Sequence, residues 1–217
     1  MEIKKMDVQI PLDDIFLNGI LQIPASAKSI VIFAHGSGSS RFSVRNQHVA
    51  DILHHANIAT LLFDLLTQEE DKTDEITSEY RFNIKLLASR LITATDWLSQ
   101  QSITHELITG YFGASTGGGA ALQAAAKRKT VKAVVSRGGR PDLAGATLSE
   151  VTSPTLLIVG GQDDIVIQMN QDAMNKMHCI KKLEIVAGAT HLFEEPGTLE
   201  EVASLAKDWF TEYLISD

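Results

Sequence analysis

Apolar residues along the chain follow two alternating patterns. Short continuous apolar runs at 29–34, 58–64 and 155–159 are typical of strands that are buried on both faces of a parallel sheet. Between such runs lie segments with helical spacing, and in 82–98 the apolar residues recur every three or four positions. Strands and helices alternate over nearly the whole length, which predicts a mostly parallel α/β sheet with helices on both faces.

The beginning of the chain has a different pattern. Residues 6–10 alternate between apolar and polar, a turn contains Asp13 and Asp14, and 19–23 follows as a second strand that Pro24 ends. This order predicts an antiparallel pair of strands at the N-terminus. The remaining expected strands are 106–112, 131–136 and 182–186, and the remaining expected helices are 44–56, an alanine-rich helix that reaches 127–129, 168–177 and 199–213.

The composition fits one α/β domain over residues 1–217. The chain is 44% hydrophobic and 21% charged, and the polar, acidic segment 66–80, which we expect to be a surface loop with a partial helix, is too short to be a full lid domain. The net charge of −8 disfavours nucleic acid as a partner, because phosphates are bound by positive surfaces. The lone Cys179 fits a reducing compartment, and no segment is typical of a signal peptide or a membrane span, so we expect a cytoplasmic protein.

The stretch 108–121 combines a strand, a sharp turn and a helix, with Gly113-x-Ser115-x-Gly117 at the turn. A serine on such a turn is strained, and glycines leave the space that the turn needs. The pattern therefore predicts a nucleophile elbow, although a chain of this length holds it by chance roughly once in fifteen times. A phosphate-binding turn is the alternative, and the absence of GxGxxG and GxxxxGK[ST] disfavours it.

Further candidate groups follow other expected strands. Ligands of parallel α/β sheets bind at the carboxyl ends of the strands. There the chain places Asp163 and Asp164 after 155–159, and His191 after the last strand. A serine, an acid and a histidine in this chain order are typical of the catalytic triad that accompanies a nucleophile elbow.

With these motifs in this order, the chain resembles an α/β-hydrolase and is most similar to the dienelactone-hydrolase-like group. The resemblance covers almost the whole chain. It implies an α/β-hydrolase fold with a minimal lid or none, and a hydrolase that needs no metal or organic cofactor. Dienelactone hydrolases proper have a cysteine nucleophile where this chain has Ser115, which favours a serine esterase. The motifs that carry the resemblance are His35-Gly36, Gly113-x-Ser115-x-Gly117, Gly160-x-x-Asp163-x-x-Val166 and Ala189-Thr190-His191.

The chemistry of acyl transfer assigns a role to each member of the triad. Ser115 is expected to attack a carbonyl carbon, and His191 to accept the serine proton and pass it to the leaving group. The resemblance favours Asp163 over Asp164 as the acid that orients the imidazole. The substrates implied are small carboxylic esters, lactones or thioesters, which would react through an acyl-enzyme.

The oxyanion hole is expected to consist of the backbone N–H groups of Ser37 and Thr116. Thr116 begins a helix, where free N–H groups and the helix dipole stabilise negative charge. Gly36 lets the backbone beside Ser37 approach the substrate. Losing one such donor typically costs about 3–4 kcal/mol of transition-state stabilisation.

Four arginines follow strands at the edge of the sheet that carries these groups. One hypothesis is that one or two of them bind an anionic group of the substrate, such as a carboxylate or a phosphate. The alternative is that they pair with Asp64 and Asp142 and fix loops. The four are Arg41, Arg45, Arg137 and Arg140.

The other histidines and the cysteine favour structural roles. His54 and His55 are adjacent, so they point to different sides of a helix and form a poor metal pair; we expect both at the surface. Cys179 is expected to be a small buried residue, and His35 to make structural hydrogen bonds. Three other functions stay open: a non-catalytic binding protein on the same scaffold, a nucleotide-binding domain and a peptidase.

Overall fold

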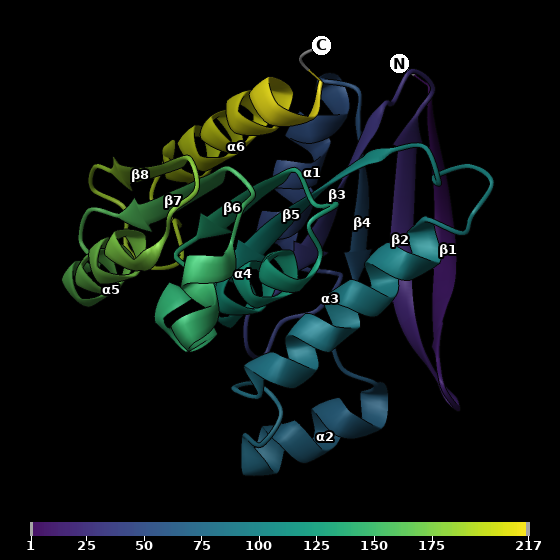
Figure 1. Cartoon of the computed structure of the whole chain (residues 1–217), viewed down its shortest axis with the longest axis horizontal. Helices are drawn as coiled ribbons and strands as arrows, with labels where there is room; N and C mark the ends of the chain where they lie inside the picture. The colour runs from purple at the N-terminus through teal and green to yellow at the C-terminus, as the bar shows by residue number, and fades with distance from the viewer. Residues whose placement is uncertain (1, 216–217) are drawn as a thin grey trace.

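Eight strands form one sheet in the order β1-β2-β4-β3-β5-β6-β7-β8 in the computed structural model, which describes residues 2–215 (Figure 1). β1 and β2 pair antiparallel, β2 joins β4 antiparallel, and all other neighbouring strands are parallel. This arrangement confirms the predicted mostly parallel sheet with an antiparallel N-terminal pair. The strands are β1 (Ile3–Leu12), β2 (Ile15–Pro24), β3 (Ser29–Ala34), β4 (Ile58–Phe63), β5 (Ile108–Ala114), β6 (Ala133–Arg137), β7 (Thr155–Gly160) and β8 (Lys181–Val186).

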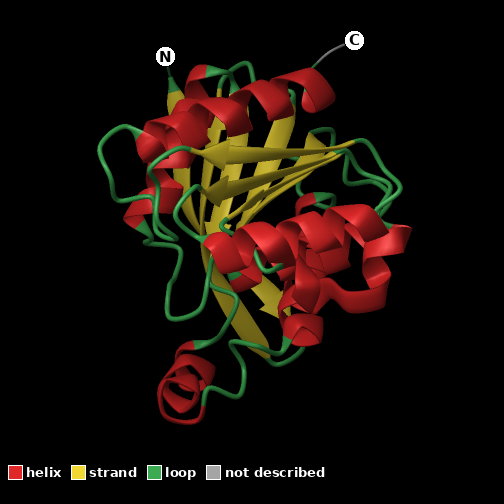
Figure 2. Cartoon of the chain, turned by 90° about the vertical axis from the view of Figure 1, so that its left-hand side faces the viewer, coloured by secondary structure: helices red, strands yellow, loops and turns green. Residues whose placement is uncertain are grey.

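Helices cover both faces of the sheet. Figure 2 shows the yellow strands between two groups of red helices. α1 and α6 contact each other on one face, while α3, α4, α5 and a 3-10 segment, η1, are linked by contacts on the other. The helical elements are α1 (Val44–His55), α2 (Gln68–Thr77), α3 (Ile84–Leu98), α4 (Thr116–Lys127), η1 (Pro141–Glu150), α5 (Asp164–Lys176) and α6 (Thr198–Leu214).

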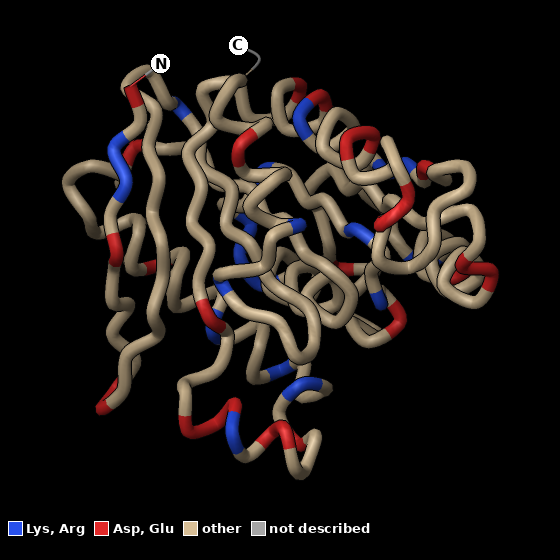
Figure 3. The backbone as a smooth tube through the Cα atoms, turned by 180° about the vertical axis from the view of Figure 1, so that it is seen from behind, with Lys and Arg blue, Asp and Glu red and all other residues tan. Residues whose placement is uncertain are grey.

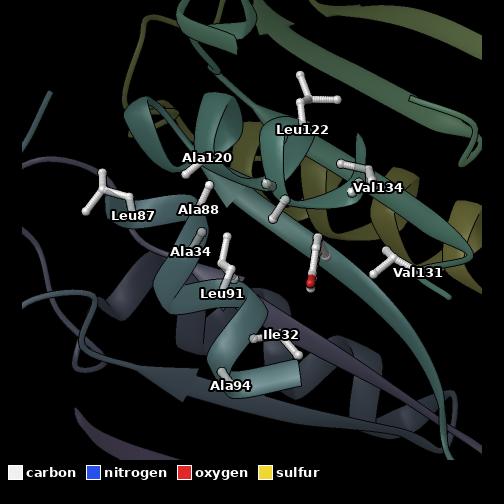
Figure 4. Packing of buried hydrophobic residues seen from close by; sticks show 14 of the residues in the cluster. Ile32, Ala34, Leu87, Ala88, Leu91, Ala94, Ala120, Leu122, Val131 and Val134 are labelled. Carbon is white, nitrogen blue, oxygen red and sulfur yellow. The ribbon is translucent and has the colours of Figure 1, made fainter. Parts of the chain in front are cut away.

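The period of two along each strand produces two separate hydrophobic cores. In β3, Ile32 packs with the α3 and α4 side of the sheet, whereas its neighbour Phe33 packs with the α1 and α6 side. Both residues are almost fully buried. Figure 4 shows the first core, in which Leu91 of α3 and Ala120 of α4 lie over the sheet. Alanines on both helices leave space for close packing, and this packing fixes α4 directly behind β5.

The segment expected to be a loop with a partial helix contains a regular helix, α2. A capping box begins it: the Thr67 hydroxyl accepts from the Glu70 N–H at 3.2 Å, and the Glu70 carboxylate accepts from the Thr67 N–H at 2.7 Å. Acidic residues dominate this helix, as Figure 3 illustrates. Two ion pairs tie α2 to the rest of the chain, Arg81 to Asp74 and Arg90 to Glu70, both at 2.7 Å.

The prediction that His54 lies at the surface is wrong. His54 is 1% exposed, and its Nε2 lies 2.8 Å from the Thr60 hydroxyl of β4. The adjacent His55 is exposed, as expected. The two residues do point to different sides of α1, and one of those sides packs on the sheet.

Within residues 2–215, no helix is long and apolar enough to cross a membrane. The same residues contain no group of three or more His, Cys, Asp or Glu side chains arranged to hold a metal ion.

Candidate active site

Ser115 occupies the sharp turn between β5 and α4. Its backbone has φ 50° and ψ −121°, a conformation that residues with a Cβ rarely adopt. The flanking glycines explain why the turn can close. A Cβ on Gly113 would lie 2.4 Å from the carbonyl oxygen of Gly117, and a Cβ on Gly117 would lie 2.2 Å from that of Ala34. The side chain of Ser115 is thus presented at the carboxyl edge of the sheet.

His191 and Asp163 come together from two different loops. His191 follows β8, Asp163 precedes α5, and the Nδ1 of His191 lies 2.6 Å from the Oδ2 of Asp163. The carboxylate accepts the Nδ1–H and leaves Nε2 free for proton transfer. Asp164, the rival acid, is exposed in the first turn of α5. The structure therefore pairs the histidine with Asp163.

Ser115 and His191 line the same pocket, which has a volume of about 200 Å³. The loop that follows β3 forms another wall of it through Gly36 and Ser37. A Cβ on Gly36 would lie 3.2 Å from the Cβ of Ser115, so this loop passes close to the serine. The pocket thus places the hydroxyl of Ser115 and the imidazole of His191 beside a closely approaching backbone segment.

The two predicted oxyanion donors are neighbours. The hydroxyls of Ser37 and Thr116 lie 3.1 Å apart, which links the loop after β3 to the first residue of α4. Among residues 2–215, the backbone N–H groups of Ser37 and Thr116 have no hydrogen-bond acceptor. Two free donors from two elements are what an oxyanion hole requires.

His35 supports this loop through hydrogen bonds at both ring nitrogens. Its Nε2 accepts a hydrogen bond from the Leu65 N–H at 2.9 Å, and its Nδ1 lies 2.9 Å from the Gly36 carbonyl oxygen. Burial lowers the pKa of His35. A neutral ring with both nitrogens engaged matches the structural role that the sequence predicts.

The structure separates the four arginines into two classes. Arg41 forms an ion pair with Asp64, and Arg140 binds Asp142 through two nitrogens at 2.9 and 2.8 Å. The loop-fixing alternative describes these two residues. Arg45 and Arg137 are different, because both line the pocket of Ser115 and His191.

Arg137 is a buried cation that has no carboxylate partner within residues 2–215. The residue is 7% exposed, and its Nε and Nη1 are buried with no hydrogen-bond partner within residues 2–215. Burial and the nearby charge of Arg45 lower its pKa to about 10. The guanidinium lies 5.8 Å from the centre of the Phe193 ring, in the loop of His191. Arg45 in turn bonds the exposed carboxylate of Glu194 at 3.0 Å.

Ser43 and Asn46 also line the pocket, and the sequence analysis does not predict them there. Ser43 caps the N-terminus of α1, where its hydroxyl accepts from the Asn46 N–H at 3.4 Å. A serine directly before a helical pattern is an N-cap signal. That signal predicts a helix start but not the pocket that the helix start faces.

The chain is similar in sequence and in fold to known hydrolases. The sequence profile described as the dienelactone hydrolase family matches residues 17–214. A crystal structure of a dienelactone hydrolase from Anabaena variabilis has 57% identity and a TM-score of 0.96, and the match covers 99% of this chain and 100% of that one. An esterase domain from Rhodothermus marinus has 19% identity and a TM-score of 0.74, covers 99% and 100% of the two chains, and indicates a shared fold alone.

Two relatives come from Mycobacterium tuberculosis, strains CDC 1551 and H37Rv, and are provisionally named phosphoribosyl transferases. Each is 56% identical over 209 residues, which are 96% of this chain and 46% of the relative. The chain therefore spans about half the length of the curated relatives it matches.

Proposed function

Because the chain belongs to the dienelactone hydrolase family, we propose that it is a serine hydrolase of small carboxylic esters, lactones or thioesters. One observation carries the proposal: Ser115, on a strained turn, shares a pocket with His191, whose Nδ1 lies 2.6 Å from Asp163. A binding protein on this scaffold would not need these three groups together.

The proposed reaction has two acyl-transfer steps. His191 Nε2 takes the proton of Ser115 as Oγ attacks the carbonyl carbon, and the oxyanion accepts hydrogen bonds from the N–H groups of Ser37 and Thr116. The tetrahedral intermediate expels the alcohol or thiol, which receives the proton from His191. Water then attacks the acyl-enzyme with His191 as base, and the carboxylic acid leaves with Ser115 restored. Asp163 stabilises the imidazolium in both steps.

The pocket size supports a preference for small substrates. Its volume of about 200 Å³ is below the usual range of about 300–1,000 Å³ for sites of drug-sized ligands. The serine at position 115 favours ordinary esters over the substrate in the family name. In our proposal, the substrate also carries an anionic group, because Arg45 and Arg137 line the same pocket.

The name of the M. tuberculosis relatives suggests a transferase as a second candidate. The match covers 46% of each relative, so the named activity has room to reside in the unmatched part. This chain also lacks the glycine-rich phosphate motifs GxGxxG and GxxxxGK[ST]. The serine hydrolase is therefore the function that we propose for this chain.

A fluorophosphonate probe tests the proposal. We expect the probe to label Ser115, located by mass spectrometry, and the label to disappear in Ser115→Ala and to fall strongly in His191→Ala. Ser149→Ala is the matched control, because Ser149 is an exposed serine outside the pocket. A folded protein that does not label would overturn the hydrolase proposal and favour the non-catalytic binding protein.

A further inference from the structure

We propose that Arg137, Arg45 and the N-terminus of α1 form a subsite for a phosphate group, so that the substrate of this hydrolase is a phosphorylated ester, lactone or thioester. The inference rests on the proposed function and adds the chemical class of the substrate. Three independent features of the pocket lead to it.

The first feature is the state of Arg137. A buried guanidinium normally has a carboxylate partner, since an uncompensated buried charge is costly. Arg137 is 7% exposed and lines the pocket, and it has no carboxylate partner within residues 2–215. The other three arginines of this edge, Arg41, Arg45 and Arg140, each have such a partner. An anion in the pocket would supply the missing one.

The second feature is the second cation. Arg45 lines the same pocket, and its Nε is also buried without a hydrogen-bond partner in the described residues 2–215. Its ion pair is to Glu194, whose side chain is 65% exposed and therefore binds weakly. Proximity of the two arginines contributes to the lowered pKa of Arg137. The pocket wall thus concentrates positive charge in a protein whose net charge is −8.

The third feature is the N-terminus of α1, which reaches the pocket through Ser43, Arg45 and Asn46. Its first turn contains no acidic residue. Within the described part of the chain, the N–H groups of Val44 and Arg45 have no acceptor, because the Ser43 cap binds the following N–H instead. The free N–H groups and dipole of a helix start stabilise an anion.

The number of donors favours phosphate over carboxylate. One guanidinium edge already satisfies both oxygens of a carboxylate. Here two guanidinium groups and a helix N-terminus meet at one pocket. A phosphate monoester has three terminal oxygens and a charge of about −1.5 to −2 at pH 7, which matches two cations and several N–H donors.

Binding measurements with the Ser115→Ala variant test the subsite without turnover. The probes are phenyl phosphate, benzoate and phenol, which differ in the charged group and share the ring. By isothermal titration calorimetry we expect phenyl phosphate to bind most tightly, benzoate to bind about tenfold more weakly or worse, and phenol not to bind measurably.

Variants of the two classes of arginine locate the binding. Arg137→Met keeps side-chain volume without the charge, and we expect it to weaken phenyl phosphate binding roughly tenfold to hundredfold. Arg137→Lys keeps the charge but not the planar guanidinium, so its affinity for phenyl phosphate should lie between those of the parent and Arg137→Met. Arg140→Met is the matched control, because Arg140 pairs with Asp142 outside the pocket, and its affinity should equal that of the parent.

Thermal unfolding of each variant establishes that it is folded. Equal or tighter binding of benzoate would overturn the phosphate assignment, and unchanged affinity in both folded Arg137 variants would overturn the subsite. Labelling of Ser115 by the fluorophosphonate in the unmodified protein reports the hydrolase separately. Binding of phenyl phosphate without labelling of Ser115 would support the subsite and refute the hydrolase. Labelling of Ser115 without binding of phenyl phosphate would support the hydrolase and refute the subsite.

Discussion

The two adjacent aspartates of the loop after β7 offer a test at the scale of single residues. Asp163 accepts the Nδ1–H of His191, and Asp164 is exposed. We expect Asp163→Asn to lower kcat/KM for p-nitrophenyl acetate by about 10²–10⁴, because an amide no longer fixes the productive imidazole tautomer. Asp164→Asn is the control and should retain the parent rate. If Asp164→Asn lowered kcat/KM more than Asp163→Asn does, Asp164 and not Asp163 would be the acid that orients His191.

At the residue scale, the sequence is most informative where the signal is local. The glycines at 113 and 117 and the order of Ser115, Asp163 and His191 are visible in the sequence, and the structure brings these side chains to one edge. The four arginines could not be separated in this way. Whether an arginine meets a carboxylate depends on tertiary packing, and Asp64 lies 23 positions from Arg41.

At the scale of elements, the packing of α1 on β4 makes a histidine sensitive to pH. Burial lowers the pKa of His54 below its ordinary value of 6.5, with a partial opposing effect from the exposed Asp51 carboxylate. The neutral ring in the folded protein therefore favours folding above pH 6.5. As the pH falls through that value, the unfolded chain takes up a proton at His54 that the folded protein does not, and stability declines.

We expect His54→Gln to reduce this pH dependence. Its free energy of unfolding should fall less steeply between pH 7.5 and 5.5 than that of the parent, by up to about 1.4 kcal/mol per pH unit. His55→Gln should follow the parent curve, because His55 is exposed. Urea titrations at several pH values provide the slopes. Equal slopes in the parent and His54→Gln would refute a lowered pKa at this position.

Sequence reasoning described elements better than their faces. The alternating apolar pattern predicts the succession of strands and helices along the chain. It does not say which side of α1 meets the sheet, and the prediction of an exposed His54 is wrong for that reason. The helix α2 is more regular than the partial helix expected for this segment, although its capping box, Thr67-x-x-Glu70, is present in the sequence. The segment has few apolar residues, so hydrophobic periodicity gave little signal there.

At the scale of the whole molecule, one sheet separates two hydrophobic cores. Leu91 of α3 lies in one core and Leu53 of α1 in the other, and both are fully buried. We expect Leu91→Ala and Leu53→Ala each to lower the free energy of unfolding by about 2–5 kcal/mol. The double variant should show a nearly additive loss, because the two side chains have no contact across the sheet.

Unfolding should remain a single transition in all three variants. The strands contribute alternate residues to both cores, so neither face can lose its packing alone. Circular dichroism and tryptophan fluorescence followed in the same denaturant series measure this. Two separated transitions would mean that the faces unfold independently.

The strained turn of Ser115 is a permanent property of the backbone, since Gly113 and Gly117 are wedged against neighbouring carbonyl oxygens. In the proposed hydrolase, the turn presents the Ser115 hydroxyl to the pocket before any ligand arrives. The serine would then be available to any small acyl compound that diffuses into the pocket. Discrimination between substrates would depend on the pocket walls, where the buried guanidinium of Arg137, without a hydrogen-bond partner at Nε and Nη1 within residues 2–215, is the feature best able to select a ligand.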